Sequence, residues 1–189
     1  MNSAVFMDTL KNADKTDYSI LMKHLMTEYG TALHCNRFAI GNSNEYAIAA
    51  VVRKTGLEVI ELQDASRIDQ EVKGLGKYSI KYSSGGDIKL HNSNNTANTD
   101  MSMHNTLLVT PHEWWYLTPD DMSAVGVNYK DYLKNTGDGL ALKSTILTAL
   151  KSRAYPLFFK FDISVDKKQC KNKETSKVFY DAIRKELGI

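Results

Sequence analysis

The spacing of hydrophobic residues predicts a helical first third of the chain. Apolar residues recur three or four positions apart in residues 4–12, 16–29 and 44–54, which is typical of helices that bury one face. Asn44 is expected to cap the third helix and Gly56 to end it. Residues 1–56 are therefore predicted to form a helical N-terminal part.

Residues 57–110 change to patterns typical of β-strands, with short apolar or alternating runs separated by turn residues. The glycines at 74 and 76 predict a tight hairpin between the second and third runs. We expect these strands to lie in one mixed sheet. The predicted strands cover residues 57–62, 67–73, 77–83, 87–92 and 106–110.

Residues 111–189 are expected to complete the fold with helices and one further strand. Thr118 and Pro119 are typical of a helix start, because a hydroxyl caps the first turn and proline suits the first helical position. The order of elements predicts one α/β (α+β) domain over residues 1–189, with a central mixed sheet flanked by helices. The later elements are expected at 138–152 (helix), 157–164 (strand) and 174–187 (helix).

Composition restricts the function only weakly. The 189 residues are 42% hydrophobic and 24% charged, which is ordinary for a globular domain. Lys and Arg number 24 against 22 Asp and Glu, so any nucleic-acid binding must depend on local patches. The chain shows neither a secretory leader nor an apolar stretch approaching the roughly 18 residues of a membrane span. We therefore expect a cytoplasmic protein with no membrane contact.

An aspartate and a lysine stand in neighbouring strands of the predicted hairpin. Side chains alternate between the faces of a strand, so Ser79 shares a face with Lys81, and Asp69 shares a face with Glu71. The register of the hairpin decides whether Asp69 and Lys81 meet. A carboxylate that holds Mg²⁺ beside an ammonium group suits phosphodiester hydrolysis. A cross-strand ion pair on a solvated face, contributing less than ~1 kcal/mol, is the alternative interpretation.

The segment YSIKYSSGGDIKLHN, with nine residues between Asp69 and Ser79, resembles the PD-(D/E)XK nuclease superfamily in its SIK-type variant. That superfamily includes many type II restriction endonucleases. The resemblance covers roughly residues 44–92. It implies that Asp69 binds a metal ion, that Lys81 helps activate water, and that the main-chain carbonyl of Ile80 completes the metal shell. It also implies a restriction-endonuclease-like fold.

Two positions depart from the pattern of the superfamily. Ile68 stands where proline is common, and Ser79 stands where Asp or Glu is usual, so one acidic metal ligand is missing. Glu45, Glu61 and Glu71 are the candidates to supply it, and the helix glutamate of many members favours Glu45. The expected catalytic residues are Asp69, Lys81, Ser79 and Glu45, and the expected metal ligands are Asp69, Ile80 and Glu71.

The resemblance implies a Mg²⁺-dependent endonuclease, of which a type II restriction enzyme cutting double-stranded DNA as a homodimer is the leading form. A repair or junction nuclease and a non-catalytic nucleic-acid-binding protein are the alternatives. The aromatic residues 114–116 are expected in the core, with base stacking as the alternative. Side chains after the hairpin suit contacts to bases and phosphates, and the expected DNA contacts are Lys89, His91, Asn92, Asn94 and Asn95.

Overall fold

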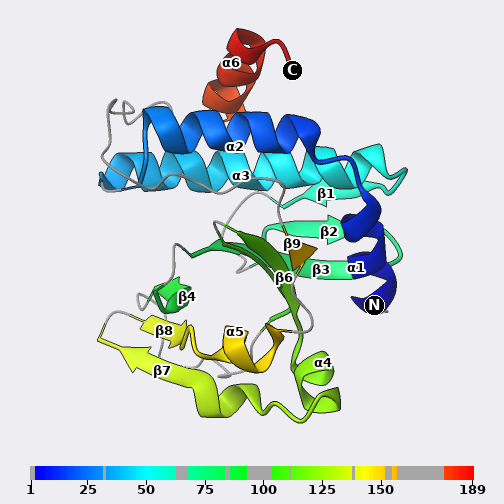
Figure 1. The fold of residues 1–189 in the computed structure, drawn as a ribbon, viewed down its shortest axis with the longest axis vertical. Helices are drawn as coiled ribbons and strands as arrows, with labels where there is room; N and C mark the ends of the chain where they lie inside the picture. The colour runs from blue at the N-terminus through cyan, green and yellow to red at the C-terminus, as the bar shows by residue number, and fades with distance from the viewer. Residues whose placement is uncertain are drawn as a thin grey trace.

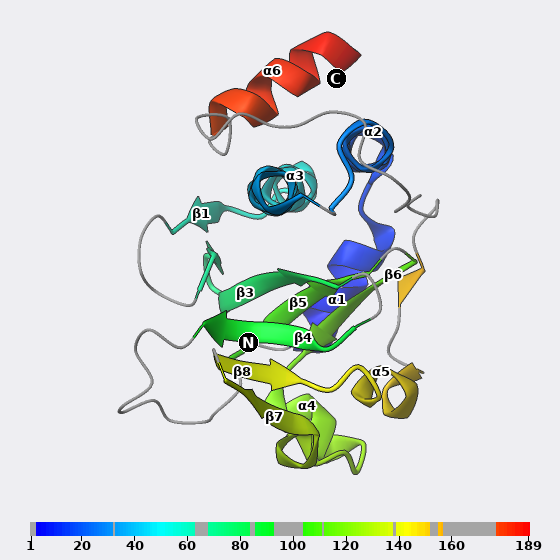
Figure 2. The same cartoon turned by 90° about the vertical axis from the view of Figure 1, so that its left-hand side faces the viewer.

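The computed structural model describes residues 3–31, 33–62, 68–83, 86–92, 104–110, 112–137, 139–151, 155–156 and 177–189. Within this part of the chain, helices cover one face of a six-stranded mixed sheet, and a three-stranded sheet lies on the opposite side (Figures 1 and 2). The prediction of an α+β fold with a central mixed sheet flanked by helices is confirmed. The prediction that all strands share one sheet is wrong.

The helical layer is built from the two ends of the chain. Figure 2 shows α2 and α3 almost end-on above the sheet, with α6 lying across α3. The three helices predicted in the first 56 residues are confirmed in number. The elements of this layer are α1 (Ser3–Asn12), α2 (Thr16–Glu28), α3 (His34–Lys54) and α6 (Lys177–Leu187).

Helix α3 is much longer than predicted, because it begins at His34 and not at residue 44. Asn44, the predicted cap, lies inside the helix, where its Oδ1 accepts a hydrogen bond of 2.9 Å from the buried Tyr18 hydroxyl. Asn36 and Ser43 are buried as well. Because these polar residues occupy buried positions of α3, the sequence does not show the regular spacing of apolar residues that predicts a helix. Gly56, with a φ of 86°, follows the helix as expected.

The six-stranded sheet has the order β1-β2-β3-β5-β6-β9. Strands β3 and β5 run parallel, and the other neighbours are antiparallel. The predicted hairpin is confirmed as β2–β3, and Gly74 adopts a φ of 77° in its turn. Strand β6 was not predicted. The strands are β1 (Val59–Glu61), β2 (Gln70–Val72), β3 (Gly76–Tyr82), β5 (Thr106–Val109), β6 (Glu113–Leu117) and β9 (Tyr155–Pro156).

The second sheet has the order β4-β8-β7, formed by β4 (Ile88–Asn92), β8 (Gly139–Leu142) and β7 (Leu133–Thr136). The predicted helix over 138–152 is wrong, because a β7–β8 hairpin precedes a short α5 (Ile146–Ala149). Ile146, Leu147 and Leu150 recur at a helical spacing, whereas Leu140 and Leu142 are two apart, which is the spacing of a strand, and both are buried. The predicted strand at 157–164 lies outside the described residues.

The six-stranded sheet separates two hydrophobic cores. Trp114 and Tyr116 belong to the core on the side of the helices. Trp115 and Leu117 belong to the core between the six-stranded and the three-stranded sheet. Met122 of α4 (Pro119–Ala124) belongs to the same core. The alternation along β6 confirms that the aromatic residues 114–116 are core residues. Each side of the sheet is therefore fixed by large buried side chains.

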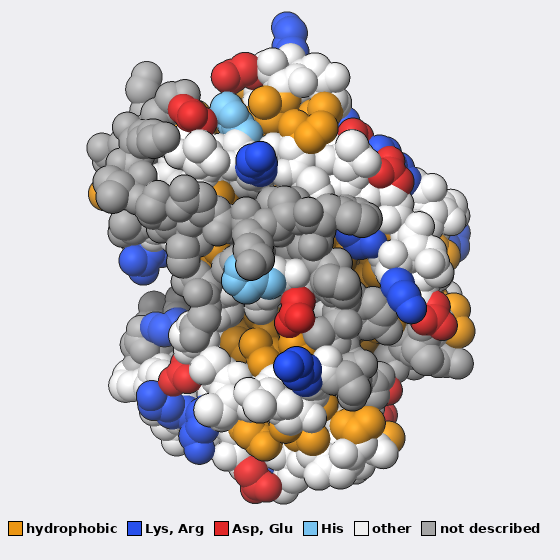
Figure 3. Space-filling view, viewed as in Figure 1, with side chains coloured by type: hydrophobic (Ala, Val, Ile, Leu, Met, Phe, Trp, Pro, Cys, Tyr) orange, Lys and Arg blue, Asp and Glu red, His pale blue; other side chains and the backbone are white. Residues whose placement is uncertain are grey.

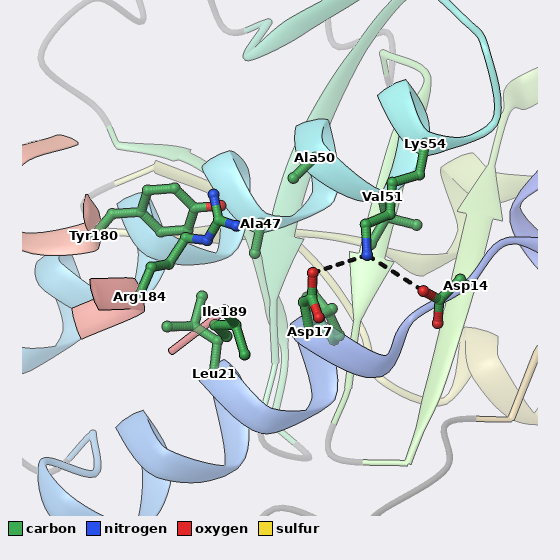
Figure 4. Close-up of a pocket in the computed structure, with 11 residues that line it drawn as sticks. Asp14, Asp17, Leu21, Ala47, Ala50, Val51, Lys54, Tyr180, Arg184 and Ile189 are labelled. Carbon is green, nitrogen blue, oxygen red and sulfur yellow. Dashed lines mark hydrogen bonds and ion pairs between the residues drawn. The ribbon is translucent and has the colours of Figure 1, made fainter. Parts of the chain in front are cut away.

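A small cavity lies within the helical layer, between α2, α3 and α6 (Figure 4). Lys54 closes one end of it through ion pairs to Asp17 (2.8 Å) and Asp14 (3.2 Å). Its volume is about 40 Å³, which is room for water but not for an organic ligand. The cavity is therefore a packing feature of the helices. None of the helices in the described ranges combines the length and apolar composition needed to cross a membrane.

Candidate active site

The end of the β2–β3 ladder brings Asp69 and Lys81 together. Gln70 is the last paired residue of β2 and lies opposite Tyr78, and the Asp69 N–H donates to the carbonyl of the same Tyr78 at 3.1 Å. The regular pairing therefore stops at Gln70, and Asp69 lies just outside it, at the edge of β3. Lys81 Nζ lies 3.6 Å from Asp69 Oδ2. This distance is an ion pair and too long for a good direct hydrogen bond.

The main chain of Ile80 orients the Asp69 carboxylate. The Ser79 N–H donates to Asn105 O on the β5 side, so the next residue along the strand directs its peptide groups to the opposite edge. There β2 has ended, and the Ile80 N–H donates to Asp69 Oδ2 at 2.5 Å. The Ile80 carbonyl faces the same edge as the carboxylate. The two oxygen groups that the resemblance assigns to a metal ion therefore face the same edge of β3.

Glu45 of α3 belongs electrostatically to the same cluster. The pKa of Glu45 is raised from 4.5 to about 8, chiefly by burial and next by the negative charge of Asp69. Lys81 lowers the Glu45 pKa, and Glu61 raises it by a smaller amount. A cation close to both carboxylates would offset this repulsion. The structure thus groups three of the four predicted catalytic residues, and Ser79 lies buried beside them.

Gln70 connects the helix to the hairpin, and sequence reasoning did not identify this role. Its side chain is buried, donates to the Glu45 carbonyl at 2.6 Å and accepts from the Tyr78 hydroxyl at 2.7 Å. The signal was present in the sequence, because Gln70 shares the apolar face of its predicted strand with Ile68 and Val72. A polar residue at such a position is expected to have buried hydrogen-bond partners.

The other two candidate glutamates are held by basic partners. Glu71 lies opposite Lys77, with 3.6 Å between Glu71 Oε2 and Lys77 Nζ. Glu61 pairs with Arg53 at 2.7 Å. The structure therefore does not bring Glu71 to Asp69 as a shared metal ligand, since two residues along a strand separate side chains by about 6.6 Å.

A groove of about 630 Å³ opens beside Lys81, between the first half of α3 and strands β3 and β4. Ile80 and Lys81 line it together with Lys89, one of the predicted DNA contacts. His91 and Asn92 lie in β4, but their side chains fall outside the described part of the structure, as do all atoms of Asn94 and Asn95. The candidate active site is therefore continuous with a groove that carries a predicted DNA contact.

The oxygen donors at this edge fit Mg²⁺ in kind. Among the described residues, no three His, Cys, Asp or Glu side chains converge as a metal-binding group. A cation here would be held by the Asp69 and Glu45 carboxylates, the Ile80 carbonyl and water. Mg²⁺ is commonly bound by one or two carboxylates and several waters. The raised pKa of Glu45 arises first from burial and then from the charge of Asp69, and a bound cation would offset both effects.

On the face shown in Figure 3, basic and acidic side chains are interspersed, and the described residues there gather no large patch of one sign. This agrees with a formal net charge of only +2. Comparison of the chain with protein-family models, curated proteins and solved structures found no match. Any functional proposal must therefore be argued from the geometry of the site itself.

Proposed function

We propose that this protein is a Mg²⁺-dependent endonuclease that hydrolyses phosphodiester bonds in DNA. The proposal is carried by one observation: Asp69 and Lys81 are 24% exposed or less and stand 3.6 Å apart at the edge where β2 ends. The Ile80 carbonyl and the Glu45 carboxyl supply further oxygen groups there. Clusters of mutually perturbing charges beside a groove are typical of catalytic sites.

Each residue has a chemical task in this proposal. Asp69 and Glu45 would bind Mg²⁺, which when bound polarises a phosphate and lowers the pKa of a coordinated water. The Lys81 ammonium group stabilises the negative charge that develops on the phosphate during attack. The hydrogen bond from the Ile80 N–H holds the Asp69 carboxylate in place before substrate arrives. Ser79, which stands where the superfamily usually has an acid, is buried.

Two forms of this activity differ in their substrates. A homodimeric restriction enzyme would cut double-stranded DNA at a two-fold symmetric site. A repair or junction nuclease would instead act where the duplex is interrupted. Phe38 lines the neighbouring groove and is exposed. An exposed aromatic ring can stack on an unpaired base, which favours the second form.

Incubation with supercoiled plasmid tests the proposed function. Cleavage with Mg²⁺ and none with EDTA is the expected result. Discrete fragments would indicate a restriction enzyme, whereas nicking confined to interrupted or unpaired DNA would indicate a repair or junction nuclease. Retarded migration of intact plasmid, with no cleavage in Mg²⁺ or Mn²⁺, would contradict the proposal and indicate a non-catalytic DNA-binding protein.

A further inference from the structure

The groove beside Lys81 has an aromatic wall contributed by α3. Phe38 lines the groove and is 52% exposed. Gly41 lies three residues further along the helix, on the same face, and lines the same groove. A Cβ added to Gly41 would meet no atom within 4 Å. The glycine therefore leaves room next to an exposed aromatic ring, and flat molecules stack in such places.

The groove also carries the charges that a phosphodiester chain needs. Three of the described lining residues are basic, namely Arg37, Lys81 and Lys89. The acidic lining residue, Asp87, pairs with Lys134 at 3.0 Å and is therefore largely neutralised. Positive groups along a groove together with an aromatic surface are the combination that binds unpaired nucleic acid.

The Arg37 side chain, which lines the groove, is held by a hydrogen bond to the main chain. Its Nε donates to the Thr31 carbonyl at 2.6 Å, just before α3 begins. That hydrogen bond uses one of the five N–H groups of arginine. A guanidinium fixed in this way loses less conformational entropy when it contacts a phosphate.

We propose that this groove binds an unpaired nucleotide of the cleaved strand, with the base stacked on Phe38 and the flanking phosphates contacted by Arg37 and Lys89. The proposal rests on the proposed function, because Lys81 joins the groove to the cleavage site. In a duplex, neighbouring base pairs cover the face of each base. A side-chain ring stacks only on a base that is unpaired or extruded. The substrate class is therefore DNA with a single-stranded or displaced nucleotide beside the scissile phosphate.

Fluorescence anisotropy in EDTA tests the groove without cleavage. The probes are a labelled single-stranded oligonucleotide and its blunt duplex. Phe38→Ala is expected to weaken binding of the single strand by about ten-fold or more, which corresponds to the loss of one base–aromatic stack. Binding of the duplex should change by less than about two-fold, since no stacking is lost there. Phe38→Trp should keep the affinity of the wild-type protein.

Two further variants separate stacking from folding. Val125→Ala removes another exposed hydrophobic side chain (48% exposed) outside the groove and should leave single-strand binding unchanged. Gly41→Leu should fill the groove and weaken single-strand binding, while the helix keeps its stability because leucine is the better helix former. Melting temperatures of all variants are measured alongside.

The outcomes distinguish this inference from the proposed function. If Phe38→Ala binds the single strand as tightly as the wild-type protein, the inference is wrong, even where Mg²⁺-dependent cleavage is present. If Phe38→Ala changes the molecular mass of the protein in solution, Phe38 belongs to a protein–protein contact and the inference is again wrong. Phe38-dependent binding without any cleavage would support the groove and overturn the nuclease.

Discussion

The β2–β3 hairpin carries two carboxylate–lysine pairs with the same separation and different surroundings. Lys77 and Glu71 lie 3.6 Å apart near the turn, with side chains 54% and 34% exposed. Lys81 and Asp69 are also 3.6 Å apart, but they are 24% and 19% exposed. In addition, Asp69 accepts the Ile80 N–H and acts on the Glu45 carboxyl of α3. The exposed pair and the inner pair thus belong to one hairpin.

The difference shows how burial turns an ordinary ion pair into a candidate site. An exposed pair contributes at most about 1 kcal/mol, because water screens the charges. The inner pair stands beside a second carboxyl whose charge is disfavoured at neutral pH, an arrangement that costs stability in the absence of a cation. Stored electrostatic cost of this kind is typical of functional sites. The exposed pair is therefore a matched control for each experiment on the inner pair.

The largest expected effect is on cleavage. Asp69→Asn and Lys81→Met should each lower the rate of Mg²⁺-dependent plasmid cleavage by at least about a hundred-fold, because one removes a metal ligand and the other the charge facing the phosphate. Glu71→Gln and Lys77→Met should stay within about two-fold of the wild-type rate, since an exposed pair does no chemistry. Equal losses from both pairs would show that the hairpin matters only for folding.

The second effect concerns metal binding. Thermal unfolding in the absence of DNA measures it. Mg²⁺ at about a hundred times its Kd should stabilise the protein by about 2.7 kcal/mol. The stabilisation should be larger at about pH 9 than at about pH 6, because Glu45 must lose its proton to bind the ion. Glu45→Gln should remove this pH dependence, and Glu71→Gln should retain it. A shift in melting temperature that is the same in all three proteins would place the ion elsewhere.

The third effect tests Gln70, which lies between Asp69 and Glu71 in the sequence and donates a hydrogen bond to the Glu45 carbonyl. Gln70→Leu should destabilise the protein by about 1–3 kcal/mol, because the buried Tyr78 hydroxyl loses its acceptor. Adding Tyr78→Phe should recover part of that loss, since both polar groups are then gone. Chemical denaturation measures both variants. If the double variant is as unstable as the sum of the single variants, the hydrogen bond is not the cause.

The smallest effect is the pH dependence of stability without metal. The folded protein keeps the Glu45 proton to about pH 8, whereas the unfolded chain loses it near 4.5. The folded state therefore binds more protons between these values, and the free energy of unfolding falls as the pH rises through this range. Glu45→Gln should remove most of that decline, because glutamine gains no proton in either state. Denaturation curves at several pH values for Glu45→Gln and Glu71→Gln measure it, and identical slopes would contradict the assignment.

Local patterns sufficed for some elements of the fold. The hairpin followed from its glycines, and the core position of Trp114 and Trp115 followed from the rarity of exposed aromatic clusters. Strand alternation also paired Asp69 with Glu71 and Ser79 with Lys81. Whether the two faces coincide depends on the hairpin register, which only the hydrogen-bond ladder fixes.

Long-range packing determined what the sequence did not reveal. The first half of α3 was missed because buried polar residues such as Asn36 and Asn44 obtain their partners from α2 and the turn that follows it. Strand β8 was mistaken for the start of a helix because Ile146, Leu147 and Leu150, which follow it, recur at a helical spacing. The resemblance already favoured Glu45, but its electrostatic coupling to Asp69 depends on how α3 packs against the hairpin. The groove at Phe38 depends on how α3 lies against β3 and β4.

A manganese-soaked crystal tests the central claim most directly, since anomalous scattering locates the ion independently of any assay. We expect one ion within coordination distance of the Asp69 carboxylate and the Ile80 carbonyl, with Glu45 turned toward it and Lys81 beside it. A fully soaked crystal in which the ion lies elsewhere, at Glu71 for example, or in which Asp69 keeps only its lysine partner, would contradict the account.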